Sequence, residues 1–363
     1  MIVYFLFFYS WNYSSLFFKI SYNKLFIVKW RIFIYIKRKN KHSPDIIRFS
    51  KHKNLLDFGF KNQVKKYFKK LEIGKLNTFS SNELIEFIET CYSYAKISLN
   101  KYSSKYSKQM YSQPTLFIIV ALKIYLNVTY REIADFIAFS DKLKRYLGIK
   151  QAPDYSTLQK FYKRMPTNMF ERITNQLIGN LEIEPKIIAL DGSGFSSDYA
   201  DKYYLKIRGY NVKHFTKSHI AIDIESRMIL YSQAVRGPRH DTKFAIAAIR
   251  SLKKYNIQYI IADKAYDTEP IRNCINVEIK ALDQIPLKSN FRHGWYRRLS
   301  QKTFKKEIYS RRNNVESVFS VIKRRFSGIN KSKSTRLRNK ETRLKTLVYN
   351  IVQYIKISKR IST

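Results

Sequence analysis

Acidic side chains are scarce in this chain. Of its 363 residues, 27 are Asp or Glu and 69 are Lys or Arg, which gives a formal net charge of +42. The basic residues are spread along the chain, and so large an imbalance repels itself unless a polyanion neutralises it. The composition therefore indicates a nucleic-acid partner, with an anionic membrane surface as the alternative.

Cysteine is also nearly absent. The sequence has two cysteines, Cys91 and Cys274, and no Cys-x-x-Cys or Cys/His ligand spacing. This pattern argues against a zinc site and indicates a reducing compartment. We therefore expect a cytoplasmic protein that associates with the nucleoid.

Long hydrophobic runs are missing except near the start. The first charged side chain is Lys19, so an uncharged stretch precedes it that only reaches the lower limit for a membrane-spanning helix. Polar residues such as Ser10 and Asn12 interrupt this stretch, and no basic region or small-residue cleavage site marks it as a signal peptide. We expect residues 1–78 to form a basic, aromatic extension and linker rather than a membrane span.

Helical spacing of apolar residues begins near residue 80. We expect helices over 84–96 and 114–126, and Thr129 and Asp154 stand where shorter helices should be capped. Short helices joined by tight turns are typical of helix-turn-helix domains, so residues 79–180 are predicted to form an α-helical DNA-binding domain. Four polar side chains would then be available to DNA: Gln159, Lys160, Lys163 and Arg164. A helical bundle that only packs on the rest of the chain is the alternative.

Strands and helices alternate over residues 181–363, which predicts an α/β domain. The apolar run KIIALDGSG is expected to stop at Asp191 and a Gly-Ser-Gly turn, and the run YIIAD stops at Asp263. Between them, two alternating segments predict a hairpin that closes near Ser226 and Arg227. If the strands before the two aspartates lie side by side, both carboxylates emerge at one edge of the sheet.

A third acidic residue lies on a predicted amphipathic helix. The stretch from Tyr309 to Lys323 lacks Pro and Gly, and its apolar residues recur at helical spacing. Arg312 and Glu316 share one face of this helix with Tyr309 and Lys323, because the steps between the four are three, four and seven residues. A single Glu among many cations suggests that it binds a metal ion while its neighbours hold phosphate. The alternative is a solvated face with internal ion pairs.

These three segments resemble the motifs of the DDE transposases of bacterial and archaeal insertion sequences, which carry a Tyr-Arg-Glu-Lys signature on a ribonuclease-H-like domain. The resemblance implies a catalytic, metal-binding triad of Asp191, Asp263 and Glu316. It also implies that Tyr309, Arg312 and Lys323 contact DNA. One departure is that Gly192 follows the first aspartate directly.

Three carboxylates repel one another unless cations lie between them, and Mg²⁺ suits such a site because it prefers oxygen ligands. We expect two Mg²⁺ ions, with Mn²⁺ as a substitute, to support in-line displacement at phosphorus. The expected partner is double-stranded DNA, at transposon ends and at the target, with a homodimer as a candidate assembly. No small-molecule substrate and no membrane are expected.

Two further segments bear on the site. Basic and aromatic residues alternate over 288–312, which favours a groove for an unpaired strand, and we expect Trp295, Arg297 and Arg298 to contact DNA there. A basic loop with one or two buried aromatics is the alternative. Asp241 precedes a predicted helix, so the favoured interpretation is an N-cap, and a supporting role beside the metal ligands is the other.

The sequence thus predicts a ribonuclease-H-like catalytic domain over 181–363, preceded by a helix-turn-helix-like domain, in a transposase of an insertion sequence. Two alternatives remain open. One is a non-catalytic, basic DNA-binding protein derived from a transposase. The other is a nuclease of the same fold, which cuts DNA without transferring a strand.

Overall fold

The computed structural model describes residues 81–197, 215–289 and 293–362, a single helical residue at 207, and four short strands near the N-terminus. The chain forms two compact units, Met1–Phe79 and Ser80–Thr363. No helix in these described ranges is long and apolar enough to cross a membrane.

The described part of the first unit is an antiparallel sheet of order β2-β1-β3-β4. Its strands are β1 (Val3–Phe7), β2 (Leu16–Lys19), β3 (Ile32–Ile36) and β4 (Asp45–Ile47). The remainder of the predicted extension and linker lies outside the described residues.

The second unit begins with six helices, four of which the sequence predicts: those near 84–96 and 114–126 and those capped by Thr129 and Asp154. They are α2 (Ser81–Ser98), α3 (Gln113–Tyr125), α4 (Tyr130–Phe139), α5 (Asp141–Tyr146), α6 (Tyr155–Arg164) and α7 (Asn168–Asn180). Helix α3 is buried along nearly its whole length, so it forms the centre of the helical part. Thr129 and Glu132 form a reciprocal capping box at the start of α4, and Asp154 accepts from the Ser156 backbone N–H at 2.8 Å.

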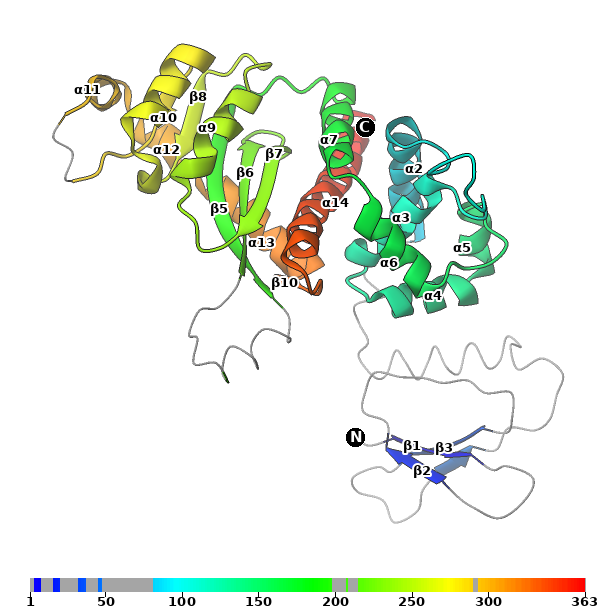
Figure 1. Cartoon of the computed structure of the whole chain (residues 1–363). Coiled ribbons are helices and arrows are strands. Elements are labelled where there is room, and N and C mark those ends of the chain that lie inside the picture. The colour runs from blue at the N-terminus through cyan, green and yellow to red at the C-terminus, as the bar shows by residue number, and fades with distance from the viewer. Residues whose placement is uncertain are drawn as a thin grey trace. The chain divides into compact units, whose positions relative to one another are not determined.

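A mixed sheet of order β7-β6-β5-β8-β9 follows, with β10 pairing along part of β5 (Figure 1). Its strands are β5 (Ile187–Ser197), β6 (Phe215–Asp223), β7 (Ile229–Arg236), β8 (Tyr259–Ala262), β9 (Leu282–Gln284) and β10 (Ile329–Asn330). Strands β6 and β7 form the predicted hairpin, and β8 and β9 run parallel to β5. This mixed sheet with flanking helices is a ribonuclease-H-like fold.

The prediction that the first strand stops at Asp191 is wrong. Strand β5 continues through Gly192 and Gly194 to Ser197, and β6 pairs with it from Ile188 to Ser196. A Gly-Ser-Gly sequence suggests a turn when only neighbouring residues are considered. Here the β6 backbone provides a full ladder of partners, which holds these residues extended.

Helices complete the second unit. They are α9 (Thr242–Ser251), α10 (Glu269–Asn273), α11 (Trp295–Thr303), α12 (Lys306–Ser310), α13 (Asn313–Phe326) and α14 (Thr335–Ser362). A 3₁₀ turn covers Lys264–Tyr266, and a π-helical turn, Cys274–Ile279, extends α10.

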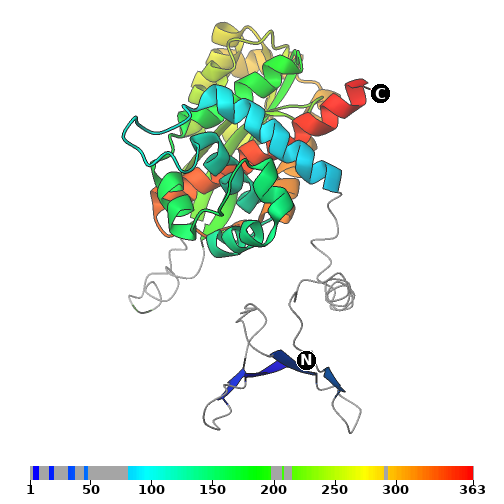
Figure 2. The same cartoon turned by 90° about the vertical axis from the view of Figure 1, so that its right-hand side faces the viewer.

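Helix α14 joins the helical part to the sheet. It packs against β6 and β7 on one side and against α2, α3 and α7 on the other, as Figures 1 and 2 show. The Asn350 amide accepts from the Ile229 N–H at 2.9 Å and donates to the Ile229 carbonyl at 2.8 Å, so it satisfies the backbone of edge strand β7. The helical part and the sheet share this helix and form one compact unit, so the division predicted near residue 180 remains a prediction about function.

Candidate active site

Two aspartates lie side by side at the junction of β5 and β8. Leu190 pairs with Ala262 in the parallel register, and Asp191 and Asp263 are the next residues of their strands. The backbone N–H of Gly192 donates to Asp191 Oδ1 at 2.8 Å, and that of Lys264 donates to Asp263 Oδ1 at 2.7 Å. Each carboxylate is therefore oriented by the backbone that follows it.

Arg312 links the third acid to the first. Its Nη2 lies 2.5 Å from Glu316 Oε1, and its Nη1 lies 3.5 Å from Asp191 Oδ2. We expect Arg312 to hold a phosphate, but in this structure its guanidinium bridges two of the three predicted metal ligands. Sequence spacing pointed to the Arg312 and Glu316 pair, whereas the contact with Asp191 depends on how α13 packs against β5.

The predicted single helix from Tyr309 to Lys323 is in fact two helices. Helix α12 ends at Ser310, and α13 begins at Asn313. In the turn between them, the N–H groups of Arg311 and Arg312 donate to carbonyls only three residues back, at 3.2 and 3.0 Å, so this turn is tighter than an α-helix.

Burial and Arg312 have opposite effects on the pKa of Asp191. Burial raises the pKa of the Asp191 carboxyl, and Asp263 and Glu316 add to this effect, while the Gly192 N–H and Arg312 oppose it. Burial also works against the charge of Arg312, but the carboxylates of Asp191 and Glu316 outweigh it and raise the pKa of Arg312. A positive group in this position stabilises the acidic cluster.

Tyr309 lies on α12, and Lys323 lies in the last turn of α13. The Tyr309 ring is 5.5 Å from that of Phe304, and burial raises the pKa of Tyr309 while Arg312 opposes the shift. Lys323 donates to Ser193 Oγ at 2.7 Å and lies 5.5 Å from the Phe195 ring, and burial lowers its pKa. Because Ser193 and Phe195 belong to the continued part of β5, Lys323 reaches the sheet rather than pointing only to solvent.

Asp241 occupies the N-cap position of α9, as the favoured interpretation expects, but its side chain makes no capping hydrogen bond there. Its Oδ2 accepts from Lys217 Nζ at 2.7 Å, and its Oδ1 lies 3.0 Å from His219 Nδ1. Burial alone would raise the pKa of Asp241, but contacts with His219 and Lys217 hold it below the usual value.

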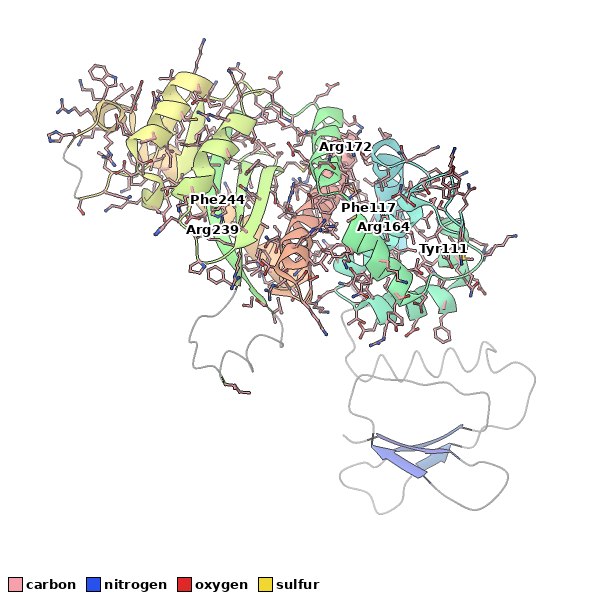
Figure 3. All side chains as sticks on the ribbon, viewed as in Figure 1. Tyr111, Phe117, Arg164, Arg172, Arg239 and Phe244 are labelled. Carbon is pink, nitrogen blue, oxygen red and sulfur yellow. The ribbon has the colours of Figure 1, made fainter. Side chains whose placement is uncertain are left out.

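The cluster of Lys217, His219 and Asp241 lies against Gly192, the residue after Asp191, and sequence reasoning missed Lys217 and His219. His219 pairs with Gly192 across β5 and β6, and its ring stacks on Phe244, labelled in Figure 3. A Cβ at position 192 would come within 2.5 Å of Asp241 Oδ1, so only glycine permits this close approach. A glycine directly after Asp191, facing alternate polar residues on the next strand, was the available signal.

The three residues predicted to contact DNA between Asp263 and Glu316 lie on α11 rather than in a loop. Trp295 is 76% exposed and Arg298 is exposed. Arg297 is held within the chain, because its Nε and Nη2 donate to Asp267 Oδ1 and to the Asp267 carbonyl, each at 3.0 Å. DNA contact by this group stays a prediction, and Trp295 and Arg298 are the two that face solvent.

Behind Asp263, a buried ionic network holds three elements together. Arg272 is fully buried and donates to Asp267 Oδ1 at 3.0 Å, to Ser300 Oγ at 2.7 Å and to the Ile285 carbonyl at 2.8 Å, and it also pairs with Asp283. These partners link α10, β9 and α11. The network was not predicted, because an Arg on a short helix resembles any surface cation in the sequence.

The family described as "Transposase DDE domain" matches residues 182–351. No protein with a curated description matches the sequence.

Two solved structures are similar in part. One is a piggyBac transposase synaptic complex with hairpin DNA, with a TM-score of 0.41, 9% identity, and coverage of 78% of this chain and 74% of that chain. The other is a pre-cleavage Mos1 transpososome, with a TM-score of 0.20, 11% identity, and coverage of 73% and 82%. The family match spans β5 to α14 and includes Asp191, Asp263 and Glu316. Residues 182–351 of the chain are therefore a transposase DDE domain.

Proposed function

We propose that this transposase binds double-stranded DNA at transposon ends and at the target, and that Asp191, Asp263 and Glu316 support metal-dependent strand cleavage and transfer. One observation carries the proposal. Arg312 contacts carboxylates from two distant parts of the chain, 3.5 Å from Asp191 and 2.5 Å from Glu316, beside the adjacent Asp263. Acidic groups drawn together in this way favour a cation between them.

The residues present fit a hard divalent ion. All three acids offer oxygen donors, which Mg²⁺ and Mn²⁺ accept. In the described ranges, no three Asp, Glu, His or Cys side chains are gathered closely enough to hold an ion as they stand. We propose that Asp191 and Asp263 hold the metal and that Glu316, which is 54% exposed, turns from Arg312 to join them. Bound Mg²⁺, as two ions, would activate the attacking oxygen and stabilise the leaving oxygen.

Arg312 and Lys323 would position the scissile phosphate. When Glu316 turns away, the guanidinium of Arg312 is free to bind a phosphate through two parallel N–H groups. Lys323 would present a point charge next to β5, and Tyr309 would pack against the displaced base or sugar. Asp241, held by Lys217 and His219, would keep the strand that carries Asp191 in place.

DNA is the proposed partner because of charge and exposure. The net charge of +42 needs a polyanion, and four polar side chains of α6 are exposed: Gln159, Lys160, Lys163 and Arg164. Trp295 and Arg298 would meet an unpaired strand near the catalytic site. A homodimer on two transposon ends, and a nucleoid-associated location in the cytoplasm, follow from the same proposal.

A strand-transfer assay tests this function. The full chain, incubated with Mg²⁺, the DNA ends that flank its gene and a target plasmid, should cleave the ends and join them to the target, and chelation of the metal should stop both steps. Cleavage without joined products would favour a nuclease of the same fold. Absence of both, with DNA binding intact, would contradict the catalytic proposal.

The roles of Arg312 and the acids can be separated experimentally. Arg312→Ala should lower strand transfer on the order of 100-fold, since a positioning error of about 1 Å has this cost. Metal affinity, measured by calorimetry without DNA, should be retained, because a guanidinium is not a metal ligand. Arg311→Ala is the matched control, because Arg311 pairs instead with the exposed Glu225. If metal affinity collapses together with activity, Arg312 does not have the proposed role.

A further inference from the structure

A cavity of about 880 Å³ lies between the helical part and α14, beside edge strand β7. Its walls come from the end of α6, the start of α7, the first turns of α14 and Ala234 of β7. Asp191 and Asp263 lie where β5 meets β8, so two strand positions separate the cavity from the catalytic acids. The cavity is therefore distinct from the site described above.

Cations line this cavity. They are Arg164, Arg336, Lys340 and Arg343, and none of the described residues that line it is acidic. Lys340 already donates to the carbonyls of Tyr162, Lys163 and Met165 at 2.9, 3.1 and 2.7 Å, so it holds the end of α6. Arg164 and Arg336 are exposed and face an open space. Figure 3 labels Arg164 at the end of α6.

Two polar atoms in this wall are buried without a hydrogen-bond partner among the described residues. They are Arg343 Nε and Asn339 Oδ1. Burial lowers the pKa of Arg343, and Glu171 on α7 opposes the shift. A buried donor with no acceptor is costly, which suggests that a ligand oxygen completes it. The Asn339 amide can present a donor after a half turn, since its oxygen and nitrogen are assigned by their contacts.

The N-termini of two helices also line the cavity. Helix α7, of 13 residues, begins at Asn168, and its N-cap residue Thr167 makes no side-chain capping bond. Helix α14, of 28 residues, begins at Thr335. Thr167, Asn168 and Thr335 all line the cavity. At α14, Ser334 Oγ already accepts from the Leu337 N–H at 3.3 Å. The start of α7 has no side-chain cap, so its backbone N–H groups and the positive end of its helix dipole favour an anion, most of all a phosphate.

We propose that this cavity, defined by Arg164, Arg336, Arg343 and the start of α7, binds backbone phosphates of DNA as a contact outside the catalytic site. This inference rests on the proposed DNA-binding function. The three arginines offer planar groups that can bind phosphate oxygens in a bidentate manner. The net charge of the chain, +42, also favours a polyanion such as DNA. The contact would fix the DNA against the seam between the helical part and the sheet, without reading its sequence.

The test compares the salt dependence of DNA binding for two double variants of the full chain. In R164Q/R336Q, both exposed arginines of the cavity lose their charge. The plot of log K, the DNA-binding constant, against log[salt] should become shallower, with the magnitude of its slope lower by about 1.8. That is about 0.9 for each of two lost phosphate contacts. The matched control, K150Q/K253Q, removes the same charge from exposed sites elsewhere and should keep close to the wild-type slope. Thermal unfolding should be unchanged in both variants.

The remaining outcomes separate the explanations. Equal changes of slope in the two variants, or no change in R164Q/R336Q, would overturn the proposal. Stabilisation of the wild type, but not of R164Q/R336Q, by inorganic phosphate, with unchanged DNA slopes, would assign the cavity to a free anion and overturn it too. Wild-type binding that does not depend on salt would instead contradict the proposed DNA-binding function itself.

Discussion

Asp191→Asn, Asp263→Asn and Glu316→Gln are each expected to lower metal-dependent cleavage by on the order of 1,000-fold or more. Each substitution keeps the shape of the side chain but removes an anionic oxygen that would hold the metal, and metal ions supply several kcal/mol of transition-state stabilisation. Their contribution arises mainly in the transition state, so DNA affinity should change little. Cleavage rates and DNA binding, measured on the same preparations, check this result.

The control for the three acids of the site is an exposed acid outside it. Glu225→Gln is a suitable control, because Glu225 is 67% exposed and pairs only with Arg311 in the described contacts. It should cleave at close to the wild-type rate. Near-normal cleavage by any of the three site variants would remove that residue from the catalytic group. Loss of DNA binding in all three would show instead that the cluster is needed for folding or for binding.

Arg272→Met is expected to lower the free energy of unfolding by about 3–5 kcal/mol. The variant leaves the buried carboxylates of Asp267 and Asp283 without their cation, and removing one partner of a buried pair is far more costly than removing both. Urea-induced unfolding, followed by circular dichroism, measures the change. Because the network joins α10, β9 and α11, partial unfolding should begin there.

A second arginine provides the control for burial. Arg250 makes a bidentate pair with Glu278 at 2.8 Å, but its side chain is 61% exposed. Arg250→Met should therefore cost far less stability than Arg272→Met, as is usual for an exposed pair. Adding Asp267→Asn and Asp283→Asn to Arg272→Met should recover part of the lost stability. Equal losses in the two single variants would show that burial of the network contributes little.

Local patterns predicted several of the helices and the hairpin correctly. The capping box of Thr129 and Glu132, the cap at Asp154 and the hairpin of β6 and β7 involve residues close in sequence, so their spacing is sufficient evidence. The sequence placed Asp191 and Asp263 together on the condition that their strands lie side by side. The parallel pairing of β5 and β8 up to Leu190 and Ala262 meets that condition.

Interactions between distant residues were predicted less well. Gly192 suggests a turn until β6 pairs with it, and Asp241 suggests a helix cap until Lys217 and His219 approach it. Arg272 cannot be distinguished in the sequence from the many exposed arginines. In each case the contacts of the residue depend on which groups are buried together in the fold. The spacing of residues along the chain does not show which groups these are.

The sequence by itself predicted most of the strands and helices, the three acids and a polyanionic partner, because periodicity, capping and total charge are properties of the chain alone. Only the tertiary structure decided that Arg312 lies between Asp191 and Glu316, that α14 joins the helical part to the sheet, and that Arg164, Arg336 and Arg343 line one cavity. Those arrangements depend on packing between segments far apart in the sequence, where burial and the satisfaction of polar groups select one pairing among many.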